Sequence, residues 1–157
     1  MLINNIEFAC KKQTTSGTVD LVKLTRANNL LDELEGELTF KVQGDLDNSK
    51  RPILNVIICG KMHALCQTCL SKMEIPVQHI GEVAIFDNEA DLEEALFGEE
   101  AAYSDGILTD PEFDLLNFIE DEIIMLIPVA PKHDSCDPVS YKDESSNPFG
   151  AIKQLIN

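Results

Sequence analysis

The segment IEDEIIMLIPVAPKHDSC, residues 119–136, combines a run of three acids, an unbroken apolar stretch, two prolines, a histidine and a cysteine. Apolar residues recur at helical spacing through its first half and in the residues before it. Asp110 is a suitable N-cap and Pro111 suits the first helical position. The helix must end before Pro128, because the residue preceding a proline avoids the α region. The segment therefore predicts one main helix over residues 111–127, followed by extended chain.

Three stretches upstream of this helix alternate apolar and polar residues, which is the pattern of half-buried strands. They cover residues 36–46, 53–65 and 73–85, with short connections between them. Pro76 cannot donate a ladder hydrogen bond, so it predicts that the third strand has an exposed edge or starts late. The sequence therefore predicts an α+β fold, in which an antiparallel β-meander packs against one main α-helix.

The length and the apolar content predict a single domain over residues 1–157. Residues 87–106 are acidic and poor in core-forming side chains, which predicts a flexible acidic loop. Residues 137–146 predict a polar linker, and Asn147 with Pro148 indicates the start of a short C-terminal helix. Since neither a membrane-spanning apolar run nor a signal-peptide pattern occurs, we expect a cytoplasmic protein.

The net charge of −16 belongs to one continuous part of the chain. Residues 73–131 contain sixteen Asp and Glu and no Lys or Arg, while the other residues carry twelve acids and twelve bases. Such a charge distribution repels phosphate backbones and attracts basic partners. It therefore disfavours direct nucleic-acid binding, although an acidic segment that only keeps the protein soluble is an equally open reading.

Glu120, Asp121 and Glu122 do not form an acid–base pair. Consecutive residues of a helix point about 100° apart, so the three carboxylates cannot converge on one substrate atom. We expect a solvated face with one flanking acid, paired with a Lys or Arg of the meander. The chain also lacks a Gly-rich phosphate loop, a nucleophile elbow and an HExxH motif, so we expect no enzymatic activity.

Two short motifs together form a candidate zinc site. The CQTC motif places Cys66 and Cys69 in the connection between two predicted strands. The motif HDSC places His133 and Cys136 three residues apart beyond the helix. Structural zinc takes four nitrogen or sulfur ligands, so these residues predict a Cys₃His site.

The other cysteine–histidine pair does not join this set, because Cys59 and His63 lie four residues apart on a strand, about 13 Å when extended. Two alternatives to zinc stay open. The four residues could be reduced thiols and an imidazole without metal, or the CxxC could be a redox dithiol. The redox alternative is less favoured, because a thioredoxin-like CxxC opens a helix rather than joining antiparallel strands.

Three motifs of this chain resemble, in order and spacing, the YceD family. They are PILNVIICGKMHALCQTCL, IEDEIIMLIPVAPKHDSC and NPFGAIKQLIN, and the resemblance runs from about Gly36 to the end of the chain. The family is named for large ribosomal RNA subunit accumulation. The family's motif positions fall on Cys66, Cys69, Glu120, Asp121, Glu122, Ile123, Pro128, Pro131, His133, Cys136, Asn147, Pro148 and Phe149.

The resemblance implies a non-enzymatic factor in large-subunit ribosome biogenesis that supports 23S rRNA accumulation. Combined with the charge distribution, it predicts that the acidic segment binds a basic ribosomal protein or a pre-ribosomal particle of the large subunit rather than RNA directly. The alternative function is a zinc- or thiol-dependent redox or metal-handling protein, with zinc as the one candidate cofactor.

Overall fold

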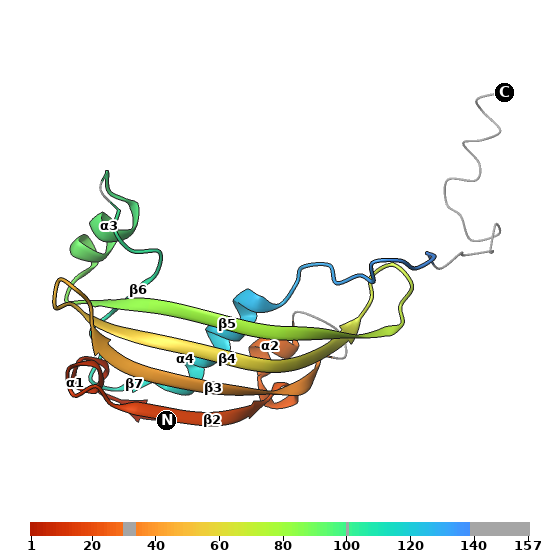
Figure 1. The fold of residues 1–157 in the computed structure, drawn as a ribbon, viewed down its shortest axis with the longest axis horizontal. Helices are drawn as coiled ribbons and strands as arrows, with labels where there is room; N and C mark the ends of the chain where they lie inside the picture. Colours follow the sequence, from red (N-terminus) through yellow and green to blue (C-terminus); the bar gives the residue numbers. More distant parts are fainter. Residues whose placement is uncertain (30–33, 100, 139–157) are drawn as a thin grey trace.

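The computed structural model describes residues 1–29, 34–99 and 101–138. The predicted α+β class is confirmed by a five-stranded sheet in the order β2-β3-β4-β5-β6, a two-stranded ribbon of β1 and β7, and the surrounding helices (Figure 1). The strands are β1 (Leu2–Ile3), β2 (Thr14–Asp20), β3 (Glu35–Leu46), β4 (Pro52–Leu65), β5 (Lys72–Phe86), β6 (Gly106–Leu108) and β7 (Phe113–Asp114). The helices are α1 (Asn5–Cys10), the short 3-10 helix η1 (Leu21–Lys23), α2 (Thr25–Asn28), α3 (Glu89–Phe97) and α4 (Leu115–Leu126). No helix within the described ranges is long and apolar enough to cross a lipid bilayer.

The three predicted strands form the expected antiparallel meander. Strand β3 pairs with β4, and β4 with β5, in continuous antiparallel register. Strand β6 pairs in parallel with only the last three residues of β5, Ala84 to Phe86. Pro76 is exposed and lies upstream of this pairing, so the prediction that it marks an exposed edge is confirmed over the described residues.

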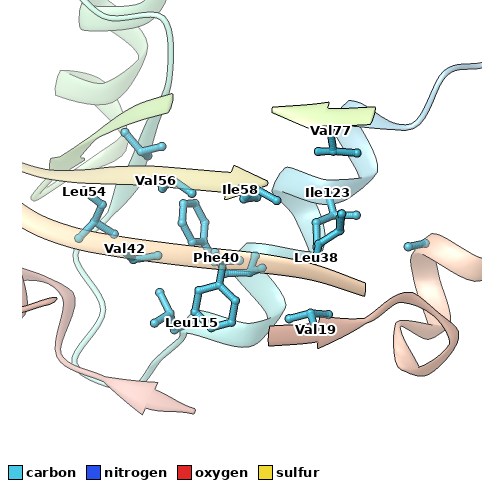
Figure 2. Packing of buried hydrophobic residues seen from close by; sticks show 14 of the residues in the cluster. Val19, Leu38, Phe40, Val42, Leu54, Val56, Ile58, Val77, Leu115 and Ile123 are labelled. Atoms are coloured by element: carbon cyan, nitrogen blue, oxygen red, sulfur yellow. The ribbon is translucent and has the colours of Figure 1, made fainter. Parts of the chain in front are cut away.

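The core lies between one face of the sheet and the helices. Alternate strand residues such as Leu38 and Val56 are buried, whereas Lys41 on the opposite face is exposed. Figure 2 shows Leu115 and Ile123 of α4 in the same cluster as these strand residues. The meander therefore packs against one main helix, as the alternation and the helical spacing predict.

Helix α4 starts at Leu115 rather than at the predicted Pro111. Asp114 is its N-cap and accepts the backbone N–H of Leu116 at 3.1 Å. The residues just before it form β7, which pairs with β1 from the N-terminus of the chain. A local cap signal cannot reveal this long-range pairing, which explains the error at the start. The predicted end before Pro128 is confirmed, since the last helical residue is two positions upstream.

Residues 87–106, predicted as a flexible acidic loop, contain helix α3 instead of loop alone. The side chain of Asn88 caps the helix by accepting the backbone N–H of Asp91 at 2.9 Å. Leu92 packs against a small second cluster that includes the buried Phe86. Acidic composition conceals this apolar anchor, because only Leu92 and Ala95 of the helix pack against the cluster.

Residues 139–157 lie outside the described part of the chain. They include most of the predicted linker at 137–146, the predicted C-terminal helix and the motif residues Asn147, Pro148 and Phe149. The single domain over residues 1–157 likewise stays a prediction.

Candidate metal centre

The two half-sites predicted from the sequence meet at one end of the sheet. The turn between β4 and β5 carries Cys66 and Cys69, and the chain that leaves α4 runs alongside this turn (Figure 1). The backbone N–H of Gln67 donates to the carbonyl oxygen of Pro131 at 2.8 Å. Pro131 is buried, so this motif proline holds the second half-site against the first.

The turn is closed around the sulfur of Cys66. The Cys66 N–H donates to the Ser71 carbonyl, and the Leu70 N–H donates to the Cys66 carbonyl, each at 2.9 Å. Leu70 adopts a positive φ of 57°, which lets the chain reverse within this short connection. The N–H of Thr68 points at Cys66 Sγ at 3.4 Å. Backbone donors directed at a sulfur stabilise its thiolate form, which is the form that binds metals.

The distances between the donor atoms fit a tetrahedral ion. Cys66 Sγ lies 3.7 Å from Cys136 Sγ, and Cys69 Sγ lies 3.4 Å from His133 Nδ1. With Zn–S bonds of about 2.3 Å and Zn–N bonds of about 2.0 Å, a tetrahedron has S–S edges of about 3.8 Å and S–N edges of about 3.6 Å. All four donor atoms lie within 4.8 Å of one another, so the four predicted residues are brought together and could bind a metal ion.

The electrostatics of the cluster divide its thiols into two kinds. Burial opposes ionisation of Cys66, but backbone N–H groups of Cys69, His133 and Thr68 prevail and lower its pKa to about 5. Burial raises the pKa of Cys136 to about 11, and the neighbouring thiols Cys66 and Cys69 add to the rise. In the absence of a cation, therefore, negative charge collects on Cys66 and is excluded from Cys136 close by.

The two remaining donors differ, because the pKa shift of Cys69 favours its metal-binding thiolate and that of His133 opposes its metal-binding neutral form. Hydrogen bonds from Ser71 lower the pKa of Cys69. The pKa of His133 is raised, chiefly by its contact with Cys69 and then with Cys66. A dication at the centre would balance the thiolates and displace the imidazole proton. Because Cys66 is fully buried, the cluster suits metal ligation better than reaction with a large substrate.

Two of the three acids of α4, Glu120 and Asp121, share the partner Arg26, and Glu120 is not on a solvated face. It is buried, and Oε1 accepts the backbone N–H groups of Arg26 and Ala27 at 2.8 and 3.3 Å. The Arg26 side chain also contacts both Glu120 and Asp121. The basic partner of these acids therefore comes from α2 rather than from the meander, and nothing in the spacing of the sequence identifies Arg26.

Glu122 does contact the meander, through a residue that sequence reasoning assigned no role. Its Oε2 lies 3.0 Å from His79 Nε2 on β5. His79 occupies a partly buried position on the strand. Cys59 lies in register with Thr39 and Gln78 within the sheet, away from the metal-ligand cluster, as the strand spacing predicts.

A family model agrees with the motif order. The model described as "Large ribosomal RNA subunit accumulation protein YceD" matches residues 54–155, which is more than half of the chain and includes all four residues of the cluster. No curated protein and no solved structure matches the chain.

Proposed function

Because this chain belongs to the YceD family, we propose that it is a non-enzymatic factor in large-subunit ribosome biogenesis that supports 23S rRNA accumulation. The observation that carries the proposal is the match over residues 54–155, which spans the CxxC turn, helix α4 and the segment that follows it. The family's name refers to accumulation of the large ribosomal RNA. The cytoplasmic location expected from the sequence stays a prediction.

The proposed partner is a basic ribosomal protein, met free or on a pre-ribosomal particle of the large subunit. The acidic stretch, residues 73–131, supports this choice because it carries sixteen acids and no Lys or Arg. Helix α3 presents four of these acids to solvent, and it lacks any residue buried in the main core. A surface of this sign recruits cationic protein segments and repels bare RNA.

Sucrose-gradient profiles of cells with and without the protein test the function. We expect depletion to lower the amount of mature large subunits and the ratio of 23S to 16S rRNA, and re-expression of the chain to restore both. Unchanged large-subunit levels after complete depletion contradict the proposal.

A pull-down from lysate at low salt tests the partner class. Ribosomal proteins that stay bound after nuclease treatment support direct contact with protein. Their loss once RNA is removed contradicts it, because the contact then depends on nucleic acid.

We further propose that Cys66, Cys69, His133 and Cys136 bind one zinc ion as a structural centre. The donor distances support this proposal over the alternative of a thiol redox centre. When bound, zinc would supply charge balance and a crosslink, while the four side chains orient the turn and the segment after α4 around it.

Metal analysis of purified protein separates zinc from redox chemistry. We expect one zinc per chain, lost in Cys66→Ser and retained in Cys59→Ser, a cysteine of the sheet away from the cluster. A metal-free protein with two rapidly alkylated thiols favours the redox alternative.

A further inference from the structure

A groove beside α4 has the features of a docking site and lies apart from the metal centre. It has a volume of about 410 Å³, in the range of small-ligand pockets. One wall comes from β6 and the residues just before it, with Ser104, Asp105 and Ile107. The other wall comes from α4, with Phe118, Asp121, Glu122 and Met125. The groove therefore joins the acidic segment to the main helix.

The lining of the groove is apolar at its base. Phe118 is nearly buried and Ile107 packs against the core, so both hold fixed positions. Met125 is 83% exposed, although it lies next to these apolar side chains. An exposed methionine beside a fixed aromatic ring is an adaptable contact for the hydrocarbon part of another side chain.

The carboxylates along the groove are incompletely neutralised. Asp121 is paired with Arg26 at 2.6 Å, and Glu122 meets only the imidazole of His79 at 3.0 Å. Asp105 accepts the neighbouring backbone N–H of Gly106 at 2.7 Å. Among the residues that the structure describes, no Lys or Arg forms an ion pair with Asp105 or Glu122.

The acidic groups of this arrangement repel one another in the free protein. The pKa of Glu122 is raised, first by burial and then by repulsion from Asp105 and Asp121, against the opposing effect of His79. A cation placed in the groove would relieve the repulsion. A purely apolar ligand would increase it, because it would remove water from the carboxylates.

We propose that this groove receives a lysine or arginine side chain of a basic protein partner, with its charged end at Asp105 and Glu122 and its hydrocarbon stem along Phe118 and Met125. Long basic side chains combine these two characters in one group. The groove lies within the stretch that carries the whole net charge of −16, so the field around it favours a cationic chain. The identity of the partner rests on the proposed function, whereas the position of the site rests on the groove alone.

Fluorescence anisotropy with a labelled peptide of alternating arginine and glycine tests the site at low salt. We compare the wild-type chain with the double variant Asp105→Asn and Glu122→Gln, and with the double variant Glu89→Gln and Glu93→Gln on α3. Both double variants remove the same formal charge. We expect the groove variant to bind about tenfold more weakly and the α3 variant to change much less, because Glu122 is partly buried beside the apolar side chains of the groove, whereas Glu89 and Glu93 are exposed.

A second pair of variants leaves the charge unchanged. Met125→Ser and Phe97→Ser each remove an apolar side chain that is 83% exposed. We expect Met125→Ser to weaken peptide binding and Phe97→Ser to leave it unaffected. Circular dichroism spectra that match the wild type confirm that the variants are folded.

The inference is overturned if the two double variants lose the same peptide affinity and the two apolar variants bind the peptide equally well. Peptide binding would then reflect only non-specific electrostatic attraction. Magnesium ions that displace the peptide only from the wild-type groove, at constant ionic strength, overturn it in favour of a metal ion. The gradient profiles decide the proposed function separately, because they use depletion of the whole chain and do not depend on the groove.

Discussion

Glu120 is a buried carboxylate of α4 that links this helix to α2 on the covered face of the sheet. It has 6% of its surface exposed, and it accepts two backbone N–H groups at the start of α2. The first N–H groups of a helix have no partner within the helix, so a carboxylate from α4 here replaces a side-chain cap. An acid expected on a solvated face is thus a structural anchor.

Glu120→Ala should lower the free energy of unfolding by about 2–3 kcal/mol, because it leaves the backbone N–H groups of Arg26 and Ala27 without their acceptor and removes one of the carboxylates that pair with Arg26. Asp121→Ala should cost less than about 1 kcal/mol, since the Asp121 side chain is 60% exposed. Urea unfolding measures both values. Equal losses in the two variants contradict the anchoring role of Glu120.

Glu122→Gln should make the stability less dependent on pH. The pKa of Glu122 is raised above its ordinary 4.5 by burial and by its acidic neighbours, so the folded protein holds this proton more tightly than the unfolded chain does. Its contribution is present below the ordinary pKa and is lost as the pH rises through the raised value. The variant should therefore gain stability relative to wild type near neutrality and show no gain below about pH 4, as pH-dependent thermal unfolding can measure. A gain that persists at low pH would point to packing rather than charge.

Helix α1 and strand β3 approach each other so closely that only glycine fits between them. A Cβ on Gly44 would lie 2.5 Å from both Ala9 Cα and Phe8 O. These are backbone atoms at the centre of the contact, and they cannot move independently of α1. The absence of a side chain at Gly44 therefore allows the N-terminal helix α1 to pack directly on the sheet.

Gly44→Ala should destabilise the protein by about 2 kcal/mol or more, because α1 must move away from the sheet. Gly81→Ala is a suitable comparison, since its Cβ would chiefly meet the end of the His79 side chain at 2.8 Å. The His79 side chain can rotate, so Gly81→Ala should lose less stability than Gly44→Ala. Thermal unfolding distinguishes the two, and a Gly81 variant that loses as much as the Gly44 variant would contradict the argument.

The metal centre and the acidic groove lie on different parts of the molecule and have different roles. The cluster at the end of β4 binds the chain that follows α4 to the sheet, through four side chains and the Gln67–Pro131 hydrogen bond. The groove on the side of α4 faces outward. Since the chain that directly follows α4 carries His133 and Cys136, loss of the crosslink is expected to loosen the helix that carries the groove.

A zinc chelator should lower the midpoint of thermal unfolding by about 5 °C or more in the wild-type chain, because the bound ion stabilises only the folded state. The Cys66→Ser variant should already unfold at the lower temperature and should not respond to the chelator. Added zinc should restore the wild-type midpoint and leave the variant unchanged. An equal fall in the unfolding midpoint of both proteins would show that the chelator acts at a site other than this cluster.

The meander, the end of α4 and the two metal half-sites could be predicted because each depends on neighbours in the chain. Alternation in residues 36–85 follows from the two-residue period of a strand, and Pro128 ends a helix by local steric conflict. The pairing of CxxC with His133 and Cys136 needed only the count of ligands that zinc requires. The segregation of charge is likewise visible in the sequence.

The tertiary structure alone decided which side chains meet across the fold. The start of α4 depends on β1, more than a hundred residues away, and the burial of Glu120 depends on α2. Helix α3 depends on a pocket formed by Phe86 and its neighbours. The groove exists because β6 returns beside α4 with Asp105 and Ile107 at its edge. None of these contacts has a local signal, since each gains its energy from residues that are far apart in the sequence and meet only in the folded protein.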